Sequence, residues 1–120
     1  MRLKLVYFSF PYSENPRGTA KEVTLHASDI YSFREDIILL IPHFIFDIIY
    51  DFPPGESHPE ILVKEFELIS RCDAVCYVPD RISTGVQWEL AFARWMGIPV
   101  YTIEQLINKV DLEVEGNEEG

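Results

Sequence analysis

The sequence predicts an α/β fold: a single Rossmann-like or flavodoxin-like domain whose open, mostly parallel sheet has four to five strands with helices on both faces. The chain has 120 residues and 48% hydrophobic content, which fits one compact domain with an ordinary core. Short apolar runs rich in β-branched and aromatic residues are typical of strands buried on both faces of a parallel sheet. Segments with helical periodicity separate these runs, and this alternation favours a parallel α/β architecture.

The expected strands are apolar runs bounded by turn residues. The first ends at the turn-rich segment "PYSENPRG", and the loop "FPPGESHP", with three prolines and a glycine, follows the second further along the chain. The expected strands span Leu3 to Phe10, Asp36 to Pro42, Asp73 to Pro79 and Ile98 to Ile103.

The expected helices carry apolar residues at steps of three and four. In the segment from Ser83 to Gly97, Thr84 and Gln87 have the spacing of a capping box, which predicts Thr84 as the N-cap, and Gly97 closes the helix. Pro59 suits the first position of the helix before it. The four expected helices span Thr19 to Tyr31, Pro59 to Cys72, Ser83 to Gly97 and Glu104 to Val110.

We expect one domain over residues 1–110 and a disordered acidic tail over residues 111–120. Right-handed crossovers between parallel strands place ligands at the carboxyl ends of the strands. This rule selects the loop after Phe10, the segment after Pro42 and the loop "PDRISTG" after Val78.

The formal charge of −10 has the wrong sign for a protein that neutralises nucleic-acid phosphates, so we expect no nucleic-acid polymer as a partner. The charge does not exclude a small nucleotide as a ligand in a local pocket. The longest apolar run is interrupted by Pro42, His43, Asp47 and Asp51, and falls short of the ~20 residues of a membrane helix. The first ten residues lack a cleavage site, so we expect a soluble, cytoplasmic protein with no membrane contact.

Cys72 and Cys76 stand four residues apart, which is neither a redox C-x-x-C spacing nor half of a zinc site. We interpret them as buried free thiols. No metal-binding spacing links His26, His43 and His58. We therefore predict no metal and no cofactor.

Glu89 interrupts the apolar face formed by Val86, Leu90 and Ala93. One interpretation is a structural carboxylate, stabilised near the helix start by the macrodipole or paired with Arg94. The other is a partly desolvated carboxylate that faces the cleft above the strand ends. Spacing alone leaves both open.

Glu65 interrupts a second apolar stripe, three residues after Leu62 and four before Ile69. Two carboxylates beside one crevice can divide the work of cleaving a bond at a sugar anomeric carbon, one as nucleophile and the other as proton carrier. Two unrelated, half-buried acids remain the alternative.

Several segments in order carry a resemblance to a known family: "VYFSFPYS", "IPH", "EFELISRCDAVCYVPD" and "STGVQWELAFARWMGIPVY". Together they resemble the nucleoside 2-deoxyribosyltransferase superfamily, and most closely its branch of 2'-deoxynucleoside 5'-phosphate N-hydrolases. The resemblance spans Leu3 to Ile103.

The resemblance implies catalytic roles for three residues. Glu89, four residues after Gly85, matches the nucleophile that attacks C1', and Glu65, eight before Asp73, matches the acid that assists the departing base. Tyr7 matches a tyrosine near the nucleophile. Ser83 matches a serine that holds a 5'-phosphate in the hydrolase branch.

The start of a helix also favours a phosphate site, because Ser83, Thr84 and Gly85 open a helix whose free amides attract anions. Arg17 could clamp phosphate oxygens, or it could pair with a nearby glutamate, Glu14 or Glu22. His43 could line the base pocket or be structural. The predicted substrate-binding residues are Ser83, Gly85, Arg17, Ser9, His43 and Asp80.

Three features depart from the family pattern. Phe10 stands where a glycine is usual after the first strand, and Glu65 replaces an aspartate. The aromatic segment from Phe44 to Gly55 could be a lid or a subunit contact. The resemblance implies a homodimer or higher oligomer, with Trp88, Phe92 and Trp95 as candidates for its contact.

The predicted function is cleavage of the N-glycosidic bond of a nucleoside or its 5'-monophosphate, by hydrolysis or base exchange, with Glu89 as nucleophile. The alternatives are a non-catalytic module that binds or senses a nucleotide, and an enzyme of the same fold that acts on another glycoside. The sequence leaves open the base, the sugar and the acceptor.

Overall fold

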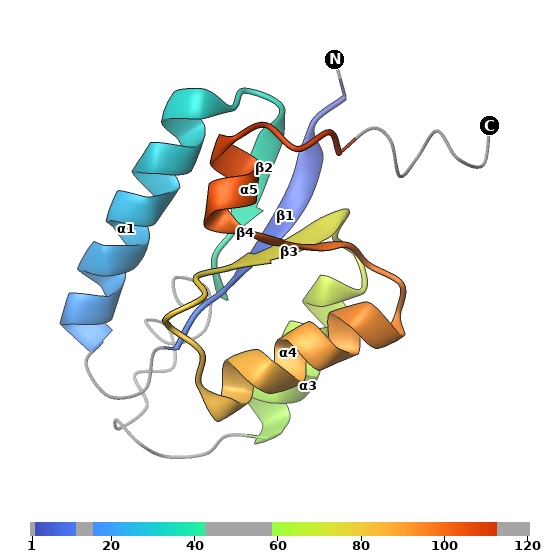
Figure 1. The fold of residues 1–120 in the computed structure, drawn as a ribbon. Coiled ribbons are helices and arrows are strands. Elements are labelled where there is room, and N and C mark those ends of the chain that lie inside the picture. Colours follow the sequence, from blue (N-terminus) through green and yellow to red (C-terminus); the bar gives the residue numbers. More distant parts are fainter. Residues whose placement is uncertain (1, 12–15, 43–58, 113–120) are drawn as a thin grey trace.

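The protein is described here by a computed structural model that covers residues 2–11, 16–42 and 59–112, with the backbone alone at positions 16 and 17. Strands and helices alternate along the chain (Figure 1). The elements are β1 (Lys4–Ser9), α1 (Pro16–Phe33), β2 (Ile37–Leu40), α3 (Pro59–Ile69), β3 (Ala74–Tyr77), α4 (Thr84–Trp95), β4 (Val100–Thr102) and α5 (Ile103–Ile107).

The strands form a four-stranded sheet in the order β2-β1-β3-β4, and every pairing between them is parallel. This order is that of a flavodoxin-like doubly wound sheet. Tyr7 of β1 pairs with Leu40 of β2 and with Val75 of β3, so β1 is a central strand. The predicted α/β class and parallel sheet are confirmed.

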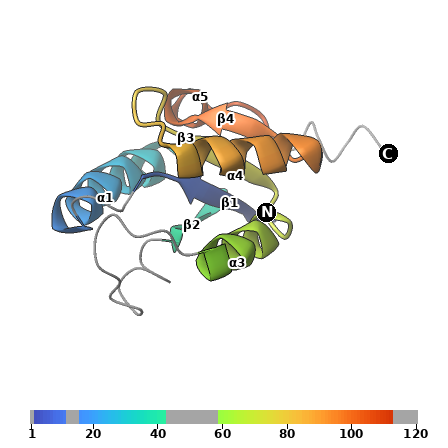
Figure 2. The same cartoon turned by 90° about the horizontal axis from the view of Figure 1, so that it is seen from below.

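Two helical layers cover the sheet. Helices α1 and α5 lie on one face, and α3 and α4 lie on the other (Figures 1 and 2). Parallel crossovers produce this arrangement, because each helix must return the chain to the start of the next strand while burying its apolar stripe. The sheet therefore has a separate apolar core on each face.

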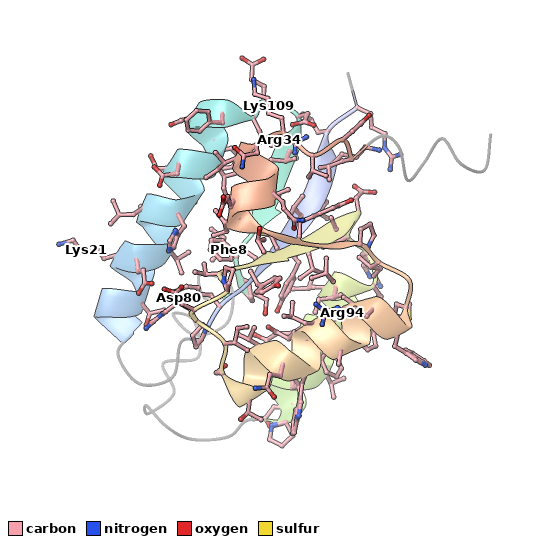
Figure 3. All side chains as sticks on the ribbon, viewed as in Figure 1. Phe8, Lys21, Arg34, Asp80, Arg94 and Lys109 are labelled. Carbon is pink, nitrogen blue, oxygen red and sulfur yellow. The ribbon has the colours of Figure 1, made fainter. Side chains whose placement is uncertain are left out.

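Alternation along β1 distributes its side chains between these two cores. Val6, Phe8 and Phe10 belong to the core under α1 and α5, and Figure 3 shows Phe8 between α1 and the sheet. Tyr7 belongs to the core under α3 and α4. Phe10 is only 2% exposed and packs edge-on against Phe8. Its ring therefore fills the α1 side of the sheet.

The helix boundaries differ from the predictions by a few residues. Helix α1 is longer than predicted at both ends, and it begins at Pro16 because proline suits the first helical position. At the start of α4 the predicted N-cap, Thr84, is wrong by one residue. Ser83 has extended backbone angles (φ −90°, ψ 175°), and its hydroxyl accepts a 3.2 Å hydrogen bond from the amide of Val86.

Gly97 ends α4 as predicted. Its φ of 77° lies in the left-handed region that favours glycine. The amide of Gly97 donates to the carbonyl of Arg94, and the amide of Ile98 donates to the carbonyl of Ala93. These two bonds form a Schellman motif, which satisfies the last carbonyls of the helix and turns the chain into β4.

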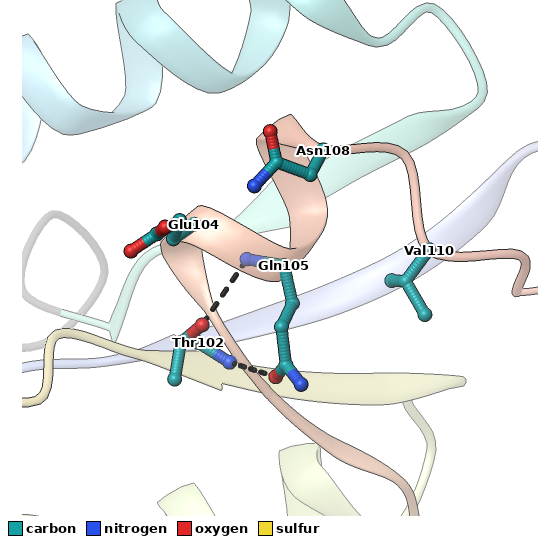
Figure 4. Close-up of a pocket in the computed structure, with 5 residues that line it drawn as sticks. All are labelled: Thr102, Glu104, Gln105, Asn108 and Val110. Carbon is teal, nitrogen blue, oxygen red and sulfur yellow. Dashed lines mark hydrogen bonds between the residues drawn. The ribbon is translucent and has the colours of Figure 1, made fainter.

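Helix α5 is shorter than the predicted segment, and a capping box fixes its start. Thr102 accepts from the amide of Gln105 at 3.1 Å, while the Gln105 side chain accepts from the amide of Thr102 at 2.8 Å (Figure 4). The helix ends before Lys109, whose φ of 64° is left-handed.

A buried arginine ties the end of α1 to the chain after α5. The Arg34 side chain is 6% exposed and forms a two-pronged ion pair with Asp36, at 2.9 and 2.7 Å. Its Nη1 also donates to the carbonyl of Val110 at 2.8 Å. The Arg34 guanidinium, by its hydrogen bonds and charge, lowers the pKa of Asp36 below its ordinary value.

Both cysteines are buried free thiols, as predicted. Burial, and the neighbouring Asp73 charge, raise the pKa of Cys72 to about 12, and burial raises the pKa of Cys76 further. Neither thiol is therefore a reactive thiolate at neutral pH. The part of the chain that the structure describes contains no helix long and apolar enough to cross a membrane.

Replacing Asp36 by asparagine should lower the free energy of unfolding at pH 7 by about 1 kcal/mol, because the ion pair with Arg34 is lost. The Asp36 pKa is lowered in the folded protein, so its contribution is present above the unfolded value of 3.8 and is lost as the pH falls below it. Urea unfolding from pH 7 to pH 3 should therefore show the difference from wild type shrinking below about pH 4. Asp29→Asn, at an exposed position of α1, is the control and should show no such difference.

Candidate functional site

The strand order places a candidate site at the carboxyl ends of β1 and β3. The chain leaves β1 toward β2 on one side and leaves β3 toward β4 on the other, so the connections diverge between these two strands. Such switch points are where doubly wound sheets bind ligands. Ser9 and Tyr77 are the last residues of the two strands and pair directly with each other. The loop into α4 begins beside them.

Glu89 comes from the second turn of α4 and points to the sheet. It is 5% exposed and shares its helix face with Val86, Leu90 and Ala93, which are also buried. The periodicity of α4 therefore carries a carboxylate into the core under α3 and α4. Arg94, the alternative partner considered for it, is exposed on α4 (Figure 3).

Two hydroxyl groups of β1 donate hydrogen bonds to the Glu89 carboxylate. The Tyr7 hydroxyl lies 2.6 Å from Oε2, and the Ser9 hydroxyl lies 2.5 Å from Oε1. Tyr7 and Ser9 are both fully buried. They share one face of β1 because they are two residues apart. The site is thus a buried carboxylate with a donor on each oxygen.

This arrangement has clear electrostatic consequences. Burying an ionised carboxylate without partners would cost several kcal/mol or more, whereas charge-assisted hydrogen bonds recover much of that cost. Fixed donors on both oxygens also restrict rotation of the carboxylate. A fixed, partly desolvated carboxylate at a switch point is suited to nucleophilic or charge-stabilising chemistry.

Glu65 lies on α3, the helix beside α4, and is half-buried. The two helices meet through Phe66 and Phe92, whose rings stack at 4.5 Å between centroids with 4° between their planes. Glu65 and Glu89 thus come from neighbouring helices on the same face of the sheet. Glu67 is exposed and pairs with Arg71 at 3.1 Å.

The loop between β3 and α4 carries three of the predicted binding residues. Asp80 is exposed in this loop (Figure 3), Ser83 caps α4, and Gly85 is exposed in its first turn. A Cβ at Gly85 would meet only the Ser83 hydroxyl oxygen, at 3.8 Å, which is an ordinary contact. The space left by the described residues therefore does not require a glycine at this position.

Sequence reasoning missed Arg81, a cation in the same loop. Its Nη2 lies 3.2 Å from Glu22 of α1, and its guanidinium carbon lies 5.2 Å from the centre of the Phe10 ring. Its Nε is buried, and the described residues offer it no hydrogen-bond partner. The sequence signal that could have identified Arg81 was its position in the loop after the third expected strand.

The remaining predictions fall on residues that the structure leaves undescribed. The Arg17 side chain, His43, the segment from Phe44 to Gly55 and the tail after residue 112 lie outside the described part. Among the residues that are described, no cluster of histidine, cysteine and carboxylate side chains could hold a metal ion. The surface depressions among the described residues include two that Glu89 does not line. One is lined by Thr102, Glu104, Gln105, Asn108 and Val110 (Figure 4), and the other surrounds Arg34 at the end of α1.

Comparison with known proteins places the fold in a recognised class. No family profile matches the sequence, and no curated protein matches it significantly. The structure is similar to a conserved protein from Enterococcus faecalis V583, with a TM-score of 0.66 and 19% identity over 83% of this chain and 62% of that chain. It is also similar to a 2-deoxyribosyltransferase from Bacillus psychrosaccharolyticus, with a TM-score of 0.59 and 18% identity over 82% of this chain and 70% of that one.

The chain therefore has a nucleoside 2-deoxyribosyltransferase-like fold, as the sequence motifs predicted. It spans 62% of the length of the Enterococcus protein, so it is the shorter of the two. At these identities the similarity establishes the fold. The activity must be argued from the site.

The N-cap assignment leads to a stability test that separates Ser83 from Thr84. Ser83→Ala should lower the free energy of unfolding by about 1 kcal/mol, because the amide of Val86 loses its acceptor. Thr84→Ala, one residue later and exposed, should change it by less than about 0.5 kcal/mol. Thermal or urea unfolding of the two variants measures both effects, and the reverse ranking would contradict the assignment.

Proposed function

We propose that the protein cleaves the N-glycosidic bond of a nucleoside or a nucleoside 5'-monophosphate, with Glu89 as the nucleophile. The observation that carries this proposal is the buried Glu89 carboxylate held by Tyr7 and Ser9 at the carboxyl ends of the strands. A fold shared with a 2-deoxyribosyltransferase supports the choice of a nucleoside as substrate.

The proposed reaction has two displacement steps at the sugar. A Glu89 oxygen forms a bond to C1' as the bond from C1' to the base nitrogen breaks, and the base leaves with the electron pair of that bond. Glu65 supplies or directs the proton that the departing base takes up. Water, or a second base, then attacks C1' and gives up a proton to Glu65. The bond from C1' to Glu89 breaks and releases the carboxylate, so the configuration at C1' is retained.

Tyr7 acts in this scheme through Glu89. Its hydroxyl proton points to Oε2, so Tyr7 orients the nucleophile and is not the proton donor to the base. Charge leaves the carboxylate in the first step and returns in the second. A buried, fixed donor stabilises the returning charge without rearrangement.

We also propose that the substrate carries a 5'-phosphate, as in the hydrolase branch of the family that the sequence resembles. Ser83 caps α4 and Gly85 stands in its first turn, where free amides and the helix dipole favour an anion. Arg17, His43 and Asp80 complete the proposed binding residues. The Ser83 hydroxyl already accepts from Val86, and its own proton is available for a phosphate oxygen.

The proposal includes an arrangement of the whole chain. Residues 1–110 form the catalytic domain, and residues 111–120 form an acidic tail. The proposed assembly is a homodimer or larger oligomer in the cytoplasm, held in part by α4. Trp95 and Trp88 are 79% and 55% exposed on that helix, which leaves a large apolar surface for a second copy.

Replacing Glu89 by glutamine should abolish the reaction. The wild-type protein and Glu89→Gln are incubated with a panel of nucleosides and 5'-monophosphates, and free base is measured by chromatography. Base release should fall by roughly a thousandfold or more in the variant, because an amide cannot form the glycosyl ester. Glu67→Gln, at an exposed glutamate of α3, is the matched control and should keep wild-type activity.

The same assay distinguishes the alternatives. Tight binding of a nucleotide by both proteins without any base release would support a non-catalytic sensor. Release only after a second base is added would identify a transferase. Equal release by wild type and Glu89→Gln would remove Glu89 from the mechanism.

Glu65→Gln tests the role of the second carboxylate. It should lower kcat by about 10- to 100-fold for bases that need a proton to leave, and much less for bases that leave readily. Steady-state rates across bases of differing leaving ability measure this dependence, with Glu67→Gln again as control. A uniform loss across all bases would contradict a role in protonating the base.

A further inference from the structure

Ser9 is an unusual residue for its position. It ends the central strand, is fully buried, and follows Val6, Tyr7 and Phe8 in a run that is otherwise apolar. Strands buried on both faces of a parallel sheet normally carry apolar side chains there. A buried hydroxyl is costly unless it is hydrogen-bonded, and the partner of Ser9 is Glu89 Oε1 at 2.5 Å.

We infer that Ser9 is a positioning residue for Glu89, an inference that rests on the proposed function. Ser9 and Tyr7 each hold one oxygen of the carboxylate, so together they fix its plane as well as its position. Each donor restricts rotation of the carboxylate about the bond to its methylene group. This role differs from the substrate-binding role predicted for Ser9 from the sequence.

The burial of Ser9 argues against direct contact with a substrate. Its one hydroxyl proton is donated to Glu89, and none of its surface is exposed. A substrate that bound Ser9 would have to displace the carboxylate that is proposed to attack it. Ser9 therefore acts through Glu89.

The hydrogen bond also affects the second step of the proposed reaction. When water or a second base attacks C1', the bond between C1' and Glu89 breaks and its electron pair returns to the carboxylate. Ser9 and Tyr7 stabilise that charge where it forms. Loss of Ser9 should therefore slow turnover without weakening substrate binding.

The first test is independent of catalysis. Ser9→Ala is introduced into the wild type and into Glu89→Gln, and urea unfolding gives a double-mutant cycle. Ser9→Ala should favour unfolding by about 10- to 100-fold when Glu89 is present, because the bond is charge-assisted. In the Glu89→Gln background, the fold-change in the unfolding equilibrium caused by Ser9→Ala should be at least about threefold smaller. Additive effects would overturn the coupling between Ser9 and Glu89.

The second test measures turnover, with the nucleoside or monophosphate from which wild type releases base fastest. Ser9→Ala should lower kcat by about 10-fold or more with no rise in KM. Ser9→Thr, which restores the hydroxyl, should recover at least about a third of the lost activity. Cys76→Ala, at a buried residue of β3 on the other face of the sheet, should lose stability but keep kcat.

The outcomes separate this inference from the proposed function. A rise in KM with kcat unchanged would indicate that Ser9 binds the substrate. If neither KM nor kcat changed, Ser9 would have no role in the mechanism. If wild type releases no base, the proposed function fails, while the unfolding cycle still decides whether Ser9 holds Glu89. Should Ser9→Ala fail to fold, Ser9→Cys keeps the side-chain size with a weak donor and takes its place in both tests.

Discussion

The central strand β1 is buried on both faces, and this constraint organises the molecule. Every second side chain must enter the same core, so Val6, Phe8 and Phe10 pack under α1 and α5. Tyr7 and Ser9 point the other way and reach Glu89 of α4. These two hydroxyls stabilise Glu89 in the core, since a buried carboxylate without partners would destabilise the fold by several kcal/mol. The packing of β1 and the chemistry of the site are therefore one arrangement.

Polar groups gather at both edges of the sheet, but they differ in purpose. At the amino-terminal edge, Arg34 joins Asp36 and the carbonyl of Val110, which closes the layer formed by α1 and α5. Asp73 accepts a hydrogen bond from the amide of Leu5 at the same edge. The bonds of these side chains are made to other groups of the same chain and stabilise the fold. At the carboxyl-terminal edge, Glu89 and the cap of α4 stand where doubly wound sheets bind ligands.

The loop between β3 and α4 connects the two sides of the molecule at that edge. Arg81 reaches across the end of β1, over the Phe10 ring, to Glu22 of α1. Two residues later Ser83 caps α4, the helix whose buried face includes Glu89. Phe10 does not fill the Glu89 side, because its ring lies on the α1 side and contacts Arg81 instead.

The sequence by itself determined the fold class, the order of the elements and the apolar faces, because these depend on local periodicity and on the strong signals of proline and glycine. It also singled out Glu89 as an acid on an apolar face. Only the tertiary structure decided that Glu89 is held by Tyr7 and Ser9, that Ser83 caps α4 in place of Thr84, and that Arg81 crosses to Glu22. Those contacts join residues distant in the chain or depend on backbone angles at one position. The periodicity of the sequence contains no information about contacts between distant residues or about the backbone angles at one position.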